Sequence, residues 1–90
     1  MNQLQKYRRV YISEDTQIPK ETTIIINMAD VVCVESNESD KYSNAFTGDL
    51  TWVCTHHESF CVRATLDAVH SDWSRWVIAE RNALFLIKSN

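Results

Sequence analysis

The sequence contains very little glycine and proline. Its 90 residues include one glycine, Gly48, and one proline, Pro19. Turns must therefore rely on Asn, Asp and Ser, which also favour reversals of the backbone. A chain with one glycine has little scope for the tight turn that presents a catalytic nucleophile beside its oxyanion hole. We therefore expect a protein that is not an enzyme.

Long apolar runs and an excess of positive charge are also missing. No apolar stretch approaches the roughly 20 residues of a membrane-spanning helix, and residues 1–6 lack the hydrophobic core of a signal peptide. These features predict a cytoplasmic protein with no membrane partner. The formal net charge of −3 disfavours DNA as a partner, because contacts to phosphate come from lysine and arginine.

β-Branched residues are abundant, and they indicate a sheet. Residues 24–26 (Ile-Ile-Ile) and 31–34 (Val-Val-Cys-Val) are dense apolar runs that favour extended backbone. Runs this apolar need cover on both faces, so they predict the centre of a small sheet. The predicted strands are residues 7–12, 22–26, 31–35, 50–55 and 60–64.

A helix and a last pair of strands are predicted to follow. Thr65 can cap a helix on which apolar residues recur at helical spacing. This stripe consists of Leu66, Val69, Trp73 and Trp76. Residues 76–78 and 83–87 are predicted to be extended, with a turn at residues 80–82.

The order of these elements predicts the fold class and the domain. Strands, one helix and further strands are typical of an α+β fold, here a small, mostly antiparallel sheet with one short helix packed on it. Residues 1–90 are expected to form one globular domain, in which residues 36–49 are a long polar loop. Tyr42 and Phe46 are the large apolar groups of this loop, and they can fold it back onto the body.

The sharpest cluster of reactive side chains lies around a predicted hairpin turn. If the hairpin turns between His57 and Glu58, Cys54 and Cys61 face each other on one side of the sheet. Together with His56 and His57 they would offer a tetrahedral zinc set, or they could form a disulfide. The favoured alternative is that the cysteines are buried beside surface histidines, so no metal and no cofactor are expected. Cys33 is also expected in the core.

The same hairpin contains a candidate interaction surface. If the face formed by Val53 and its neighbours points inward, Leu50 and Trp52 form an exposed apolar patch flanked by Arg63. Such patches bind a protein partner or a second copy of the chain. The alternative, in which both faces of the hairpin are covered, stays open.

Three segments resemble the LytTR family of bacterial DNA-binding domains. Residues 27–36 (NMADVVCVES) look like the family's strand entry, and residues 62–69 (VRATLDAV) look like its strand-to-helix passage. Residues 76–86 (WVIAERNALFL) lie where the family has its next conserved segment, and small FlbD-like regulatory proteins share the same pattern. Loops between strands of LytTR domains enter successive major grooves, so the resemblance implies that Arg63 and Arg81 contact DNA.

Two functional hypotheses follow. The first is a bacterial LytTR-like transcriptional regulator. The second is a protein-interaction or homodimeric adaptor module, encoded by a phage or mobile element, which does not bind DNA. It would use an exposed strand edge or the Trp52 face, so a protein partner or self-association is expected.

Overall fold

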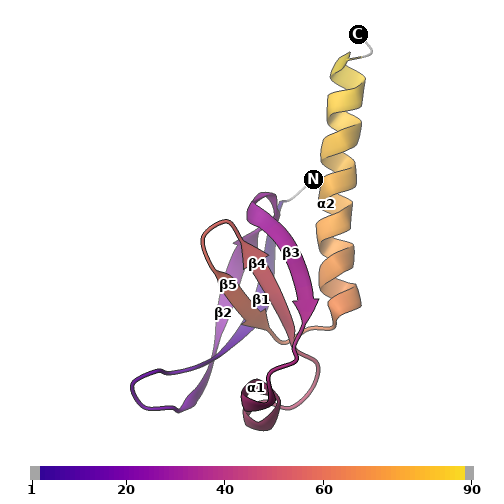
Figure 1. Ribbon diagram of the computed structural model, residues 1–90. Coiled ribbons are helices and arrows are strands. Elements are labelled where there is room, and N and C mark those ends of the chain that lie inside the picture. The colour runs from indigo at the N-terminus through magenta and orange to yellow at the C-terminus, as the bar shows by residue number, and fades with distance from the viewer. Residues whose placement is uncertain (1–2, 89–90) are drawn as a thin grey trace.

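The computed structural model describes residues 3–88, with the side chains of residues 3–79. Its elements, in chain order, are β1 (Leu4–Ile12), β2 (Pro19–Asn27), the 3₁₀ turn η1 (Met28–Asp30), β3 (Val31–Ser36), α1 (Asp40–Ala45), β4 (Thr51–Thr55), β5 (Ser59–Val62) and α2 (Leu66–Lys88). The strands form one antiparallel sheet in the order β2-β1-β5-β4-β3, and α2 lies beside β3 (Figure 1). The α+β fold with a mostly antiparallel sheet is confirmed.

The turn η1 connects the two opposite edges of the sheet. The prediction that residues 24–26 and 31–34 form the centre of the sheet is wrong, because they belong to β2 and β3, which are the outermost strands. Only the three residues of η1 separate these two strands in the chain. A 3₁₀ turn rises about 2 Å per residue, so the sheet must curl until its edges meet at this end. The side chain of Asn27 supports the turn by accepting a hydrogen bond from the Ala29 amide at 3.0 Å.

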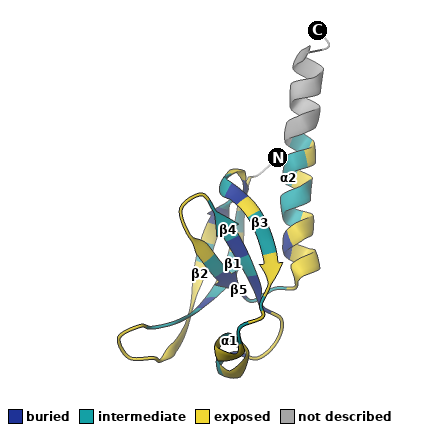
Figure 2. Cartoon of the chain, viewed as in Figure 1, coloured by how far each residue is buried: buried dark blue, intermediate teal, exposed yellow. Residues whose placement is uncertain are grey.

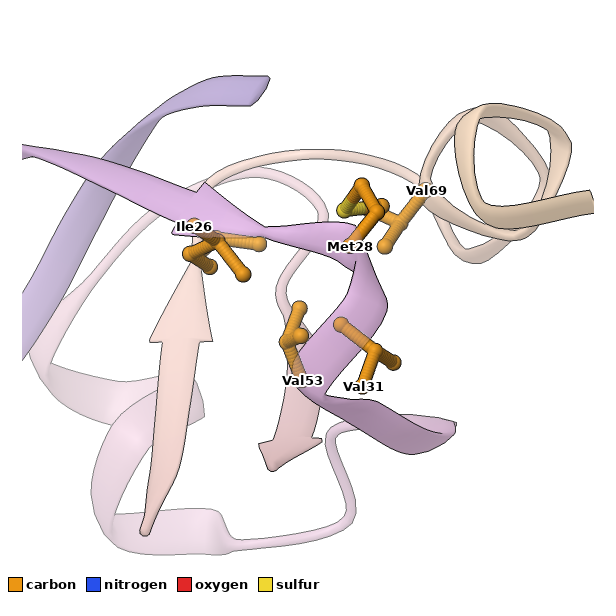
Figure 3. Packing of buried hydrophobic residues seen from close by; sticks show 6 residues of the cluster. Ile26, Met28, Val31, Val53 and Val69 are labelled. Carbon is orange, nitrogen blue, oxygen red and sulfur yellow. The ribbon is translucent and has the colours of Figure 1, made fainter. Parts of the chain in front are cut away.

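The main hydrophobic core lies inside this curl. Successive strand residues point to opposite faces, so alternate residues of each strand reach the interior. Met28 projects inward from η1 and is fully buried. Figure 3 shows it with its neighbours. The buried members of this cluster are Ile26, Met28, Val31, Val53, Val62 and Val69.

Helix α2 closes the core with its first turns. Thr65 caps it, as predicted, because its hydroxyl accepts a hydrogen bond from the Ala68 amide at 3.1 Å. Val69 is fully buried, and the rings of Trp73 and Trp76 pack against the core from partly buried positions. Three residues of the predicted stripe therefore face the sheet, while Leu66 is 37% exposed.

The predicted last pair of strands is wrong. Residues 76–78 and 83–87 belong to α2, which spans 23 residues and is therefore not a short helix. The stretch from Ala79 to Lys88 is rich in good helix formers and contains no glycine or proline, so nothing stops the helix there. No described helix is both long and apolar enough to cross a membrane.

A second apolar cluster covers the other face of the sheet. The polar segment 36–49 contains α1, and its Tyr42 and Phe46 fold back onto the sheet as predicted. Phe46, Val10, Leu50 and Cys61 are the buried members of this cluster. Both faces of the central strands are thus covered, whereas the β1–β2 hairpin tip projects from the body and is exposed (Figure 2).

Candidate functional site

The turn between β4 and β5 decides which cysteines meet. The Thr55 amide donates to the Glu58 carbonyl at 2.9 Å, and the Thr55 hydroxyl accepts bonds from the amides of His57 (3.2 Å) and Glu58 (3.1 Å). These hydrogen bonds place the centre of the turn between His56 and His57. It places Cys54 opposite Ser59, so the prediction that Cys54 faces Cys61 is wrong.

The residue opposite Cys61 is instead Trp52. Cys61 is buried within the second apolar cluster, with 1% of its surface exposed. Burial raises the pKa of its thiol to about 11, so it behaves as a small apolar core residue. The favoured expectation of a buried cysteine holds for Cys61 alone.

Cys54 meets Cys33 from the neighbouring strand. The β3–β4 register places the two cysteines directly opposite each other, and both are half-buried. Glu35 follows two residues after Cys33, and the Cys33 thiol donates to a Glu35 carboxylate oxygen at 3.8 Å. The ligand atoms of these three residues all lie within 4.8 Å of one another. We call them the thiol–carboxylate cluster.

A bulge in β3 explains why Cys33 is not a core residue. The register shifts between Val31 and Cys33, so Val31 points inward and is buried while Val32 is 46% exposed. Val34 packs against the core again, which leaves Cys33 on the outer face. A bulge adds one residue to one strand, so the residues beyond it point to the opposite face from the one that regular alternation predicts. The apolar run around Cys33 does not reveal the bulge from sequence.

The Cys33 thiol is not activated for nucleophilic chemistry. The pKa of Cys33 is raised to about 11, first by its hydrogen bond with Cys54 and then by partial loss of hydration and by Glu35. A reactive cysteine needs a lowered pKa, because the thiolate is the nucleophile. The arrangement therefore suits a ligand-binding site better than a covalent catalyst.

The two turn histidines do not join this cluster. His56 and His57 are exposed at the tip of the β4–β5 hairpin. Among the described residues, the group of potential metal ligands that comes together consists of Cys33, Glu35 and Cys54. The sequence hypothesis of a zinc set made by Cys54, Cys61, His56 and His57 is therefore wrong in its ligands.

The predicted apolar patch of Leu50 and Trp52 is not exposed. Leu50 is buried, with 8% of its surface exposed. The indole N–H of Trp52 donates to the Asn37 side chain at 3.0 Å, and its ring meets Tyr42 edge-on with centroids 5.0 Å apart. The segment that contains α1 supplies this cover, so the alternative in which both hairpin faces are covered is correct.

Arg63 is engaged in contacts within the molecule. Its guanidinium forms an ion pair with Glu21 of β2 and donates to the carbonyl of Thr47. Arg8 also donates to Glu21, at 3.4 Å. The Arg63 and Arg8 guanidiniums hold the pKa of Glu21 below its usual range. The side chain of Arg81 lies outside the described residues, and DNA contact by either arginine stays a prediction.

The outer edge of β2 is the most open element of the sheet. Within residues 3–88 no strand pairs with it, whereas α2 lies beside the opposite edge strand, β3 (Figure 1). Ile25 is 61% exposed and Ile18, just before the strand, is 53% exposed. The run of threonine and isoleucine signals a strand from sequence, but it does not reveal that this strand is an edge.

Similarity to known proteins does not indicate a function for this chain. No family model, no curated protein and no solved structure matches the chain. The resemblance to LytTR domains therefore stays a prediction.

Proposed function

We propose that the protein is a non-enzymatic binding module that forms a homodimer through the outer edge of β2. The observation that carries this proposal is the nine-residue strand β2 at the edge of the sheet, along whose outer side no described strand pairs. A long edge strand presents a row of backbone donors and acceptors to a second strand. Proteins use such edges to add a strand from a partner.

The hydrogen-bond alternation identifies the backbone groups that face outward. The Met28 amide donates to the Gln3 carbonyl at 2.7 Å, and these two residues are opposite each other in the β1–β2 register. Bonded and non-bonded pairs alternate along an antiparallel ladder, so the even-numbered residues of β2 bond to β1. The N–H and C=O groups that point away from β1 belong to Glu21, Thr23 and Ile25.

The strand is complementary to a second copy of itself. Antiparallel pairing centred on Ile24 places Ile24 opposite the partner's Ile24, Thr23 opposite the partner's Ile25, and Thr22 opposite the partner's Ile26. Cross-strand pairs of β-branched residues stabilise a sheet by about 0.2–1 kcal/mol each. This register also matches the alternation, because Thr23 and Ile25 are the residues with outward-pointing backbone groups.

The charges of β2 permit this pairing. Glu21 would lie opposite the partner's Asn27, so no two like charges face each other. The devices that protect an edge, proline and lysine, occur only at the start of the strand, at Pro19 and Lys20. Ile25, which is 61% exposed in one copy, would gain apolar cover from the partner's Thr23.

Light scattering on matched surface variants tests this function. We expect the wild-type protein to be a dimer and Ile25→Lys to raise the dimer dissociation constant at least tenfold, because the lysine opposes pairing at the centre of the edge. The control is Val32→Lys, which places the same charge at an exposed position of β3 and should leave the dimer intact. Circular dichroism checks that both variants fold.

Two outcomes would overturn the dimer. A wild-type protein that remains monomeric at high micromolar concentration contradicts it directly. A dimer that Ile25→Lys leaves unchanged, or that Val32→Lys disrupts equally, assigns the contact to another surface.

A further inference from the structure

The thiol–carboxylate cluster has the composition and spacing of a metal site. We propose that Cys33, Cys54 and Glu35 bind a thiophilic divalent cation of the Zn²⁺ class. The cluster belongs to β3 and β4, at the other end of the strand order from β2, and none of its residues lies on β2. The proposal therefore does not depend on the dimer.

The distances between ligand atoms fit one shared cation. Zn–S bonds of about 2.3 Å and Zn–O bonds of about 2.1 Å in a tetrahedron separate two sulfurs by about 3.8 Å, and a sulfur from an oxygen by about 3.6 Å. The Cys33 sulfur and the Glu35 oxygen are 3.8 Å apart. All three ligand atoms lie within 4.8 Å of one another, so small side-chain rotations bring them onto one ion.

The backbone holds the two cysteines in register. The Asn37 amide donates to the Leu50 carbonyl at 3.1 Å, and the β3–β4 alternation that follows makes Cys33 and Cys54 a hydrogen-bonded pair. The Cα atoms of such a pair are about 5.5 Å apart. The sheet therefore fixes the backbone of both cysteines, and the bulge before Cys33 places the two thiols on the same face.

The ligand types select the class of cation. Thiolates bind zinc and other soft or borderline metals, while magnesium and calcium prefer sites made of oxygen atoms alone. Two thiolates and one carboxylate supply three negative charges to a divalent ion. On binding, two S–H bonds break, two metal–sulfur bonds form, and both protons pass to solvent.

The exposure of the cluster leaves room for a fourth ligand. Cys33 and Cys54 are half-buried, and Glu35 is exposed on the same face. Three protein ligands with one position open to water are a recurring zinc arrangement. The carboxylate distinguishes this site from a simple cysteine pair, because a disulfide would use the two sulfurs alone.

Metal titration of the reduced full chain tests the site. Calorimetry with Zn²⁺ should give one ion per chain, and Co²⁺ in its place should show the thiolate-to-cobalt charge-transfer absorption. Loss of a group that only supports a metal ligand typically weakens metal binding about 10–100-fold. Cys33→Ser and Cys54→Ser each remove a direct ligand, so we expect each to weaken Zn²⁺ binding at least tenfold. Glu35→Gln should weaken it as well.

The matched control is Cys61→Ala, which removes the buried cysteine outside the cluster and should leave Zn²⁺ affinity unchanged. Absence of Zn²⁺ binding, or cobalt spectra without the thiolate band, overturns the site. So does binding that survives Cys33→Ser and is lost in His56→Ala, because that result would place the ion at the hairpin turn. Ile25→Lys separates the two proposals, since it should weaken the dimer at least tenfold and preserve Zn²⁺ binding.

Discussion

Tyr7 joins the sheet to the long helix through one side chain. Its hydroxyl donates a hydrogen bond of 2.7 Å from β1 to the carboxylate of Asp72 in α2, and Asp72 also pairs with Arg75. Burial, and then the bond to Asp72, raises the pKa of the Tyr7 phenol above its ordinary value. The neutral phenol is therefore the form that the folded protein favours.

Replacing Tyr7 tests this link. We expect Tyr7→Phe to lower the free energy of unfolding by about 1 kcal/mol near neutral pH, because one side-chain hydrogen bond is lost. The raised pKa stabilises the folded state fully below the unfolded value of about 10, and this contribution is lost progressively as the pH rises from that value toward the raised pKa of the folded state. Urea denaturation at neutral pH and above pH 10 should show a smaller alkaline loss in the variant.

Tyr11→Phe is the matched control for this experiment. The Tyr11 ring lies on the same strand, with its centroid 5.0 Å from the Arg9 guanidinium carbon, and the substitution keeps the ring. Equal stability losses in the two variants would contradict a specific role for the bond to Asp72.

The link between α1 and β4 depends on one backbone conformation. Gly48 has φ of +85°, a left-handed conformation that disfavours residues with a Cβ atom. A Cβ built there would meet an Arg63 guanidinium nitrogen at 3.6 Å, which is an ordinary contact. Any cost of a larger residue at this position therefore comes from the backbone.

We expect Gly48→Ala to lower the free energy of unfolding by about 1–2 kcal/mol, the usual cost of a left-handed conformation for residues other than glycine. Thermal denaturation followed by circular dichroism measures the change. Asp49→Ala next to it is the control, because its backbone φ is not positive. If both variants have the same melting temperature as the wild type, the turn does not constrain the start of β4.

Sequence was a good guide to these elements where local chemistry defines them. The run around Val53 predicted β4, and the hydroxyl of Thr65 predicted the start of α2. It failed for residues 76–87, because an apolar run of helix formers can be read as a strand when its tertiary neighbours are unknown. It also missed the hairpin register, which depends on the hydrogen bonds of the Thr55 side chain.

The whole molecule is held by the core where the sheet curls on itself. Met28 is the largest fully buried side chain among residues 3–79. It lies between the two edge strands and α2, whose Val69 packs in the same cluster. The same residue therefore joins β2, β3 and the helix. The overall extents of 56 × 22 × 17 Å reflect this curled sheet with the long helix beside it (Figure 1).

Met28→Ala should therefore destabilise the entire fold. We expect a loss of about 2–5 kcal/mol, the range for removing a buried methionine side chain and leaving a cavity. Val32→Ala, at an exposed position of β3, should cost less than about 1 kcal/mol. Chemical denaturation measures both, at one fixed protein concentration, because dimerisation would make stability depend on concentration. Similar losses in the two variants would contradict a core at η1.

Local sequence was sufficient for the features that short-range physics controls. These are the positions of the five strands, the cap at Thr65 and the α+β class, because strand propensity and capping act within a few residues. The tertiary structure was needed for the features that depend on register and cover. A bulge before Cys33 and a turn anchored by Thr55 bring Cys54 to Cys33 and not to Cys61. The α1 segment covers Trp52, and the order of strands leaves β2 at an open edge, since pairing between distant segments sets which side chains meet.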